Sequence, residues 1–300
     1  MRALQIGRWP MAVPQPPGMM RGMTLAPPDH DAIAAEALEA MDGARQIAPF
    51  SVRFPGLTLE DAYRILARLC ELRTARGERV IGRKIGFTNR TIWPEYGVYA
   101  PMWGFVFSAT VRDLPPPRQA AQHPLTLALF AEPRIEPEIV FRLAAAPSPD
   151  MDEAALFGCI DWVAQGFEIV QSVFPGWKFT PADTVIANGL HGALLLAPRH
   201  PAGFGNATDW VSNLACFEID LLRDGAVVDR GHAANVLDGP LSALRHLVGL
   251  LARDPVNSPL APGDIVTTGT LTRAFPISPG ESWGTRLHGI ELGGRPVWFA

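Results

Sequence analysis

The sequence predicts an α+β fold, in which a helical N-terminal section precedes a β-rich body. Up to Gly77 apolar residues recur at helical spacing, and after it short runs rich in β-branched and aromatic residues dominate. These runs do not alternate regularly with helices, which argues against a doubly wound parallel sheet. The strand-like runs cover residues 80–87, 135–143, 166–173, 184–196 and 216–222.

Composition excludes several classes of protein. Of the 300 residues 48% are hydrophobic, which is enough for a sizeable core and excludes wholesale disorder. The chain has 26 basic and 30 acidic residues, without the basic surplus of a nucleic-acid-binding protein. No apolar run approaches the roughly 18 residues of a membrane helix, so neither nucleic acid nor membrane is expected as a partner. Three widely spaced cysteines fit no disulfide framework or zinc knuckle, and they predict a cytoplasmic protein.

Three segments are expected along the chain. Residues 1–29 are proline-rich and lack the apolar stretch of a signal peptide, so we expect a disordered leader, with Met23 a candidate start. Residues 30–78 form the helical section, in which Thr58 and Asp61 make a capping box and Gly77 ends the second helix. Residues 79–300 form the β-rich catalytic body, with one catalytic domain overall.

Helices and turns are also expected within the body. Residues 152–163 and 240–252 have helical patterns, and Pro240 suits the first turn of the second one. The pairs Asp224-Gly225 and Gly293-Gly294 predict hairpin turns. Turns at 262–264 and 279–281 are expected to lead into strands.

The strongest local signal for chemistry is Glu136-Pro137-Glu138, within a strand-like run. The two-residue period of a strand places both carboxylates on one face, about 7 Å apart. At that distance they repel by roughly 2 kcal/mol, which a cation between them would remove. A solvated polar face is the alternative interpretation. Because Pro137 cannot donate to a strand ladder, we expect this strand at an edge or at a bulge.

Glu168 favours the metal interpretation, because it lies among apolar residues of a second predicted strand. Such a carboxylate is either salt-bridged or a ligand. Three carboxylates with room for water suit a hard cation such as Mg²⁺ or Mn²⁺. The histidines form no paired zinc motif, and His191, His232 and His246 are expected to be structural.

Lys84 is one of only two lysines in a chain with 24 arginines. A lysine retained against this bias indicates a site that needs a compact ammonium group. Lys84 lies between Gly82 and Gly86, and Thr88-Asn89 follows, a pattern that fits the close approach of a small anion. A surface lysine on a strand is the alternative, and the same question applies to Lys178.

These stretches occur in an order that resembles the 2-keto-4-pentenoate hydratase family, which includes the 4-oxalocrotonate decarboxylases, within the fumarylacetoacetate hydrolase superfamily. The resemblance covers about residue 57 to the C-terminus. It rests on Gly82 to Asn89, Glu136-x-Glu138, Glu168, Trp177-Lys178 to Asp183 to Asn188-Gly189, Gly239-Pro240-Leu241, and Pro262 to Thr270.

The resemblance implies a mixed β-roll of curved sheets with helices outside, in a homo-oligomer. It implies a divalent metal, Mg²⁺ or Mn²⁺, held by Glu136, Glu138 and Glu168. It also implies that Lys84 is a catalytic lysine. Thr88 corresponds to a hydroxyl near the substrate carboxylate, and Thr270 lies on the loop that closes the other side of the site.

The implied function is that of a metal-dependent lyase acting on a small 2-oxo or 2-hydroxydienoic acid, as a hydratase in aromatic-compound degradation. One departure concerns the family's Pro-Asp-Phe-Gly-like segment, which reads Pro101-Met102-Trp103-Gly104 here and lacks the aspartate. Decarboxylation of a 4-oxalocrotonate-type acid and hydrolysis of an acylpyruvate therefore stay open. A non-catalytic partner subunit is the rival from another class, and retention of Lys84 and the three glutamates argues against it.

Overall fold

The helical section forms as expected. The computed structural model describes residues 28–202 and 207–300, and most of the predicted leader therefore lies outside the described residues. The helices of the 30–78 section are α1 (His30–Asp42), α2 (Phe50–Arg53) and α3 (Leu59–Ala75). The side chain of Asp29 accepts from the first backbone N–H groups of α1, and Thr58 and Asp61 form the predicted capping box of α3.

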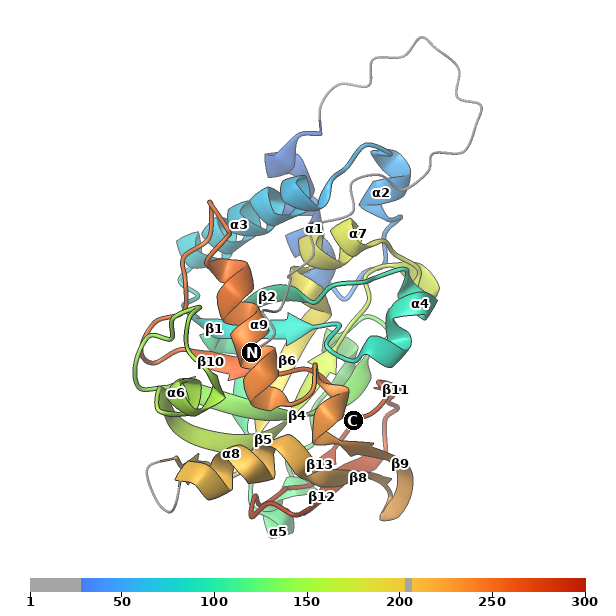
Figure 1. The fold of residues 1–300 in the computed structure, drawn as a ribbon. Helices are drawn as coiled ribbons and strands as arrows, with labels where there is room; N and C mark the ends of the chain where they lie inside the picture. The colour runs from blue at the N-terminus through green and yellow to red at the C-terminus, as the bar shows by residue number, and fades with distance from the viewer. Residues whose placement is uncertain (1–27, 203–206) are drawn as a thin grey trace.

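A mixed nine-stranded sheet forms the centre of the body (Figure 1). Its strand order is β2-β1-β10-β4-β5-β6-β3, with β11 paired to β4 and β7 paired to β5. The pairs β1–β10 and β3–β6 are parallel, and the other pairs are antiparallel. The strands are β1 (Val80–Gly86), β2 (Met102–Phe107), β3 (Val111–Asp113), β4 (Arg134–Leu143), β5 (Ile160–Val170), β6 (His191–Leu196), β7 (His200–Pro201), β10 (Ile265–Thr267) and β11 (Phe275–Pro276).

A smaller antiparallel sheet has the order β13-β12-β8-β9. Its strands are β8 (Glu218–Arg223), β9 (Ala226–His232), β12 (Ser282–His288) and β13 (Val297–Trp298). Asp224 and Gly225 both have positive φ and form the predicted two-residue hairpin between β8 and β9. The hairpin expected at Gly293-Gly294 is wrong, because β13 pairs with the far end of β12 at Ser282. The chain therefore runs back along β12 before β13 begins.

One predicted helix and one predicted strand are shorter than expected. A strand replaces the end of the helix, and a helix replaces the start of the strand. The helix predicted at 152–163 is only α6 (Glu153–Phe157), and β5 begins at Ile160. The strand predicted at 184–196 begins instead with α7 (Pro181–Ile186), which Thr180 and Asp183 cap reciprocally. The remaining helices are α4 (Trp93–Tyr96), α5 (Pro117–Ala120), α8 (Ala207–Cys216) and α9 (Pro240–Leu251), the last close to its predicted range.

Pro137 does not lie on an edge strand, so the edge alternative is wrong, and the irregularity in the β4–β5 register lies at Arg142 and Leu143, away from Pro137. β4 has β10 on one side and β5 on the other. The carbonyl of Pro137 accepts from the amide of Leu271, and the missing N–H points to the same side of the strand. On that side the partner positions of β10 begin at Val140 and those of β11 end at Ile135. Pro137 thus occupies a gap in the ladder, where no strand needs its N–H.

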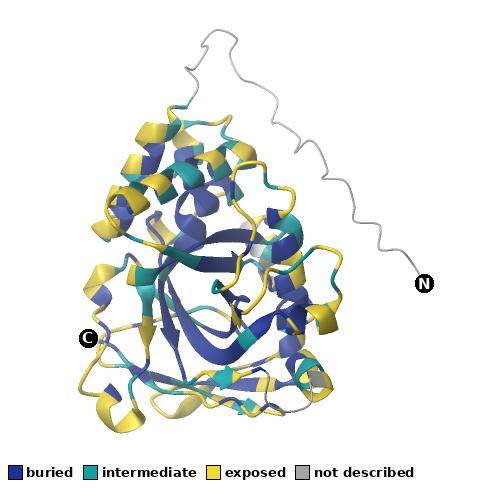
Figure 2. Ribbon diagram, turned by 90° about the vertical axis from the view of Figure 1, so that its left-hand side faces the viewer, coloured by how far each residue is buried: buried dark blue, intermediate teal, exposed yellow. Residues whose placement is uncertain are grey.

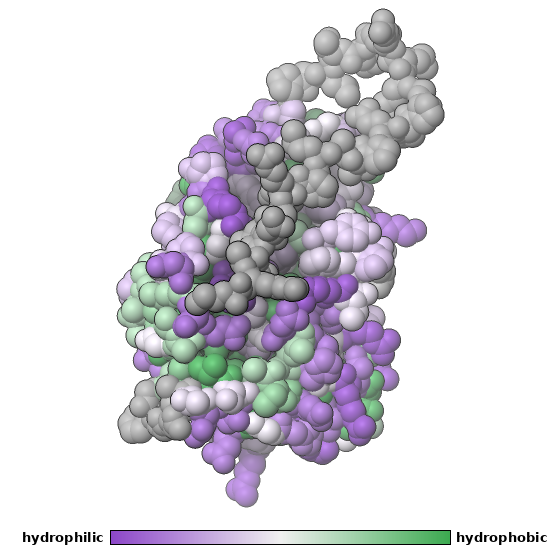
Figure 3. Space-filling view, viewed as in Figure 1, coloured by the Kyte–Doolittle hydropathy of each residue, from purple (hydrophilic) through white to green (hydrophobic). Residues whose placement is uncertain are grey.

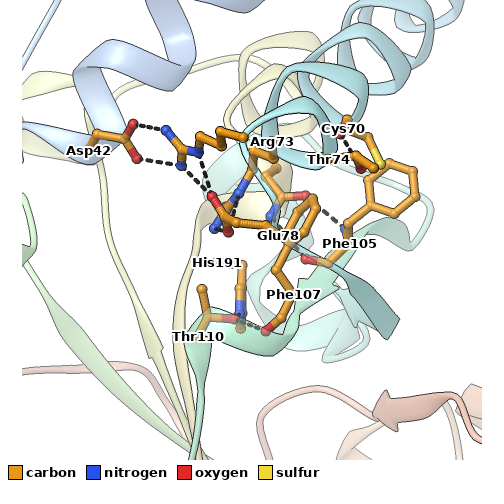
Figure 4. A network of polar contacts seen from close by, with 11 residues as sticks. Asp42, Cys70, Arg73, Thr74, Glu78, Phe105, Phe107, Thr110 and His191 are labelled. Carbon is orange, nitrogen blue, oxygen red and sulfur yellow. Dashed lines mark hydrogen bonds and ion pairs between the residues drawn. The ribbon is translucent and has the colours of Figure 1, made fainter.

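The helical section and the body share one hydrophobic core. Phe50 of α2 packs edge-on against Phe174 of the body, with ring centroids 6.2 Å apart. The backbone N–H of Ser51 donates to Asp183 in α7 at 2.9 Å. The guanidinium of Arg73, at the end of α3, lies 4.0 Å from the ring centroid of Phe107 and pairs with Glu78 (Figure 4). The 30–78 section is therefore joined to the body by buried contacts.

Burial concentrates on the large sheet, whose strands curve through the centre of the molecule between exposed helices and loops (Figure 2). Figure 3 shows hydrophilic side chains over most of one face, with a band of hydrophobic ones across its lower half. No helix in the described part of the chain is both long and apolar enough to cross a membrane.

Candidate metal centre and active site

Two neighbouring strands bring the three predicted metal ligands together. Glu136 on β4 lies directly opposite Glu168 on β5, and Glu138 lies two residues further along the same face of β4. A carboxylate oxygen from each of the three side chains lies within 4.8 Å of the others. The chain thus gathers all three acids at one point of the large sheet, closer together than strand spacing alone predicts.

The surroundings of these carboxylates fit a divalent cation. Glu138 and Glu168 are fully buried, whereas Glu136 is half-buried. The amide N–H of Gly269 donates to Glu138 Oε2 at 2.8 Å. The second oxygen, Glu138 Oε1, has no hydrogen-bond donor among the described residues, whereas Glu168 Oε2 has the Lys84 ammonium 3.3 Å away. Buried carboxylate oxygens without donors are costly, and a hard cation that prefers oxygen ligands would satisfy them.

Lys84 completes the cluster from β1. Its side chain is 5% exposed. The ammonium Nζ lies 3.3 Å from Glu168 Oε2 and donates to the carbonyl of Gly189 at 2.9 Å. A Cβ at Gly189 would lie 2.9 Å from the Cδ of Lys84, and a Cβ at Gly86 would lie 3.1 Å from its Nζ. These two glycines therefore leave the space that the lysine occupies, and the surface-lysine alternative is wrong.

The charged groups in this cluster shift one another's pKa values. Burial would lower the pKa of Lys84, but the glutamates, Glu168 first, outweigh burial and raise it. Burial also raises the pKa of Glu136 to about 7 and that of Glu138 well above its usual range, the latter with repulsion from the other acids. For Glu168 burial is outweighed by Lys84 and a hydrogen bond with His191, which together lower its pKa.

A cavity of about 60 Å³ lies beside the cluster. Four of the predicted site residues line it, namely Lys84, Thr88, Glu136 and Thr270. The hydroxyl of Thr88 is buried without a hydrogen-bond partner, and it packs where a Cβ on Gly269 would be. The hydroxyl of Thr270 donates to the carbonyl of Thr272 at 2.9 Å. Thr88 thus retains a free polar atom in the site, while Thr270 is held in its loop.

Comparison with known proteins places the chain in a family. It is 30% identical over 254 residues to the 2-hydroxyhexa-2,4-dienoate hydratase of Comamonas testosteroni, covering 84% of this chain and 91% of that protein. The chain belongs to the 2-keto-4-pentenoate hydratase family. It is also 28% identical over 271 residues to the 2-keto-4-pentenoate hydratase of Paraburkholderia xenovorans (strain LB400), covering 89% of this chain and 94% of that relative. A scan against protein-family models found no match.

A solved structure of known activity shares the fold. The 4-oxalocrotonate decarboxylase from Pseudomonas putida G7, complexed with magnesium and adipate, superposes with a TM-score of 0.80 at 24% identity. The match covers 90% of this chain and 97% of that one. The predicted family and the predicted α+β fold of curved sheets with outer helices are therefore confirmed.

The segment Pro101-Met102-Trp103-Gly104, in which the resemblance implies an aspartate, contributes no acid. Trp103 is buried, and its ring stacks on Tyr63 with centroids 5.1 Å apart. The next residue, Gly104, lies opposite Lys84 in the β1–β2 pair. Among the described residues that line the cavity, Glu136 is the one carboxylic acid.

His191 is a site residue whose role the sequence analysis missed. It was expected to be structural, and it is buried at the start of β6. Its Nδ1 lies 2.8 Å from Glu168 Oε1, and its Nε2 lies 2.9 Å from the hydroxyl of Thr110 (Figure 4). His191 therefore orients a predicted metal ligand, as histidines and carboxylates around metal sites commonly orient one another. The sequence around it, Leu190-His191-Gly192, contains no metal motif that could have indicated this contact.

Proposed function

We propose that this protein is a metal-dependent hydratase that adds water to a small 2-hydroxydienoic acid through its 2-oxo form, in the breakdown of aromatic compounds. The observation that carries the proposal is the buried Lys84 ammonium among three glutamates beside a cavity. The names of the relatives support the same reaction class, since both are hydratases of short unsaturated 2-hydroxy or 2-oxo acids.

Glu136, Glu138 and Glu168 would hold the cation, which we propose to be Mg²⁺ or Mn²⁺. When bound, such a cation supplies Lewis-acid polarisation of the carboxylate and keto oxygens of a 2-oxo acid. His191 and the Gly269 amide hold two of these glutamates in place through their other oxygen atoms. The donor set is all oxygen, as hard divalent cations prefer.

The chain's own groups would bind the substrate and move its protons. The unpartnered hydroxyl of Thr88 can donate to the substrate carboxylate. The Lys84 ammonium provides a fixed positive charge next to the enolate that forms when the dienol loses its hydroxyl proton. Protonation of this enolate at C5 gives a 2-oxo acid with a double bond between C3 and C4. Water then contributes a hydroxyl to C4 and a proton to C3. Because Met102 stands where the family segment carries its aspartate, Lys84 and Glu136 are the titratable groups on the cavity wall for these transfers.

The test is incubation of purified protein and Mg²⁺ with a panel of 2-hydroxydienoates, vinylpyruvate-type acids and acylpyruvates, with products identified by mass. Hydration adds the mass of one water to an intact dienoate, and this is the expected product. Loss of CO₂ would identify a decarboxylase instead, and cleavage into two acids would identify an acylpyruvate hydrolase. No turnover of any substrate would favour the partner-subunit alternative.

Metal dependence is tested in the same assay. A chelator should abolish turnover, because without a cation the three carboxylates repel one another and the substrate. Added Mg²⁺ or Mn²⁺ should restore activity. Full activity of metal-free protein would contradict the assignment of Glu136, Glu138 and Glu168 as ligands.

We further propose that the protein acts as a homo-oligomer in the cytoplasm. The resemblance to the family supports the homo-oligomer. The three cysteines, which are all free in the structure, support the cytoplasm. Light scattering of the purified full chain tests the assembly, and a monomeric mass would contradict it.

A further inference from the structure

The ring of His191 has a second polar partner besides Glu168, and that partner is Thr110. Nδ1 of the ring lies 2.8 Å from Glu168 Oε1, and Nε2 lies 2.9 Å from the hydroxyl oxygen of Thr110. The side chains of His191 and Glu168 are both fully buried. Because both ring nitrogens have a partner, a rotation of the ring would break two contacts at once.

The contacts of Glu168 decide which atom of the ring carries a proton. Glu168 Oε2 lies 3.3 Å from the Lys84 ammonium, and a carboxylate paired with an ammonium accepts hydrogen bonds but donates none. Nδ1 of His191 therefore carries a proton and donates it to Oε1. In the neutral ring Nε2 is then an acceptor, and the hydroxyl of Thr110 is the donor that faces it.

A hydroxyl suits this position because it can both donate and accept. The hydroxyl of Thr110 also lies 2.9 Å from the carbonyl oxygen of Phe107, which is a second acceptor for its proton. Whether the hydroxyl donates to Nε2 or accepts from it, Nδ1 of His191 remains the donor to Glu168. Thr110 therefore holds the ring in the orientation that serves Glu168.

The backbone places Thr110 beside His191 independently of this hydrogen bond. Thr110 ends the short 3-10 helix η2 (Ser108–Thr110), and β3 begins at the next residue and runs parallel to β6, the strand that His191 starts. The ring of Phe107, just before η2, is buried under the guanidinium of Arg73 (Figure 4). Removal of the Thr110 hydroxyl alone should therefore leave the course of the chain unchanged.

The orientation of Glu168 decides which of its oxygens faces the site. With Oε1 held by His191, Oε2 is left for Lys84, 3.3 Å away, and for a cation. A carboxylate without the His191 contact is free to rotate about its terminal bond and to exchange its two oxygens. Groups that hold a metal ligand in this way contribute roughly 10- to 100-fold to metal affinity or activity.

We propose that Thr110 is a positioning residue of the metal site, whose hydroxyl holds His191 so that His191 holds Glu168. The inference rests on the proposed function only in taking Glu136, Glu138 and Glu168 as metal ligands. Thr110 is not among the described residues that line the cavity. An effect of its substitution on metal binding must therefore act through its neighbours.

Calorimetry of Mg²⁺ binding to the chelator-treated full chain, without substrate, tests the proposal. Thr110→Val keeps the branched shape of the side chain and removes the hydroxyl, and we expect it to lower Mg²⁺ affinity about tenfold or more. Thr110→Ser keeps the hydroxyl and should bind Mg²⁺ almost as tightly as the unsubstituted protein. Equal affinities of folded Thr110→Val and Thr110→Ser would overturn the proposal.

Thr184→Val is the matched control for the loss of a threonine hydroxyl. Thr184 is buried in α7, and its hydroxyl donates to the carbonyl of Thr180 at 3.2 Å. This substitution removes a hydrogen bond to the backbone, as Thr110→Val does, but at a position outside the contacts of His191. Mg²⁺ affinity should be unchanged, and thermal unfolding confirms that each variant folds.

A variant of His191 distinguishes action through the ring from a merely structural role of Thr110. His191→Asn keeps a nitrogen donor bonded to Cγ, as Nδ1 is, and has no atom that reaches Thr110. In this background Thr110→Val should have no further effect on Mg²⁺ affinity, because the contact that it removes is already absent. The same loss of affinity in both backgrounds would overturn the proposal. If His191→Asn does not fold, the comparison of Thr110→Val with Thr110→Ser decides.

Failure of this inference and failure of the proposed function give different results. Mg²⁺ binding that does not depend on the hydroxyl of Thr110, together with hydration of a dienoate, would overturn the inference and leave the hydratase proposal standing. Mg²⁺ binding that depends on this hydroxyl, without hydration of any dienoate, would overturn the hydratase proposal and leave the inference standing. Absence of Mg²⁺ and Mn²⁺ binding by the unsubstituted protein would overturn the metal assignment on which both rest.

Discussion

At the scale of single residues, Lys84 is the proposed catalytic group of the site. Its ammonium is buried, contacts Glu168 and donates to a backbone carbonyl. Gly86 and Gly189 approach its side chain so closely that neither position has room for a Cβ without movement. A larger planar group would have to displace these backbone segments or enter the cavity.

The substitution Lys84→Arg is therefore expected to lower kcat roughly 100-fold or more, the usual scale for losing a positioned acid or base. Initial rates with a 2-hydroxydienoate measure the change, and thermal unfolding confirms that the variant folds. Lys178→Arg is the matched control, because Lys178 is exposed and outside the cavity lining. Normal turnover of Lys84→Arg would remove the catalytic assignment and strengthen the partner-subunit alternative.

The raised pKa of Glu136 predicts how the free energy of unfolding of metal-free protein depends on pH. Burial raises its pKa from 4.5 to about 7, so between these values the folded state binds more protons than the unfolded state. The free energy of unfolding should therefore fall as pH rises from about 4.5 to about 7. Urea unfolding of chelator-treated protein at pH 5.5 and 7.5 measures this loss.

Glu136→Gln is the control for that measurement. The variant keeps the side-chain size but cannot ionise, so its loss of stability between the two pH values should be smaller than that of the unsubstituted protein. Glu138, whose pKa is raised as well, should retain part of the effect. An equal loss in both proteins would show that Glu136 does not contribute.

At the scale of elements, the turn after β10 connects the proposed metal site with the proposed substrate site. The amide of Gly269 donates to Glu138, and its α-carbon packs against the hydroxyl of Thr88. Gly269 has φ +93°, and a Cβ there would lie only 1.8 Å from Thr88 Oγ1. Both the backbone conformation and the lack of space therefore require glycine at this position.

Gly269→Ala and Gly280→Ala separate these two requirements. Gly280 has nearly the same φ, +88°, but a Cβ there meets nothing within 4 Å. We expect Gly280→Ala to cost about 1 kcal/mol of stability from backbone strain alone. Gly269→Ala should cost about 3 kcal/mol, because crowding adds roughly 2 kcal/mol, and it should reduce turnover. Equal costs in urea unfolding would show that Thr88 moves away freely.

At the scale of the whole molecule, the N-terminal helices are part of one folded unit with the body. Their residues share its core, and α2 contacts both Phe174 and α7. The described structure begins at residue 28, and Asp29 caps α1 through its side chain. The helical section therefore packs directly on α7 and on β2, with the rings of Tyr63 and Trp103 stacked, and shares the core of the body.

Deletion of residues 1–23 tests the predicted leader. If that segment is disordered, as its proline-rich sequence predicts, the melting temperature and turnover of the shortened protein should equal those of the full chain. Asp29→Ala is the contrasting variant, and loss of its helix cap should cost about 1 kcal/mol. A clear loss on deletion of 1–23 would show that the segment packs on the body or on another subunit.

Local features that depend only on neighbouring residues could be predicted from the sequence. The capping box of Thr58 and Asp61, the Asp224-Gly225 hairpin and the shared strand face of Glu136 and Glu138 all follow from spacings of a few residues. Glu168 was predicted as a site residue because a carboxylate inside an apolar run needs a partner. Lys84 was predicted because it is one of two lysines in a chain with 24 arginines and lies between Gly82 and Gly86.

Contacts that depend on strand pairing became visible in the three-dimensional structure and could not be predicted from the sequence. The register of β4 and β5 places Glu168 opposite Glu136, and β6 brings His191 to Glu168. Pro137 could lie in the middle of the sheet because β10 and β11 leave a gap beside it. These contacts join residues far apart in the chain, and a single sequence contains no periodicity that fixes which strands pair or in which register.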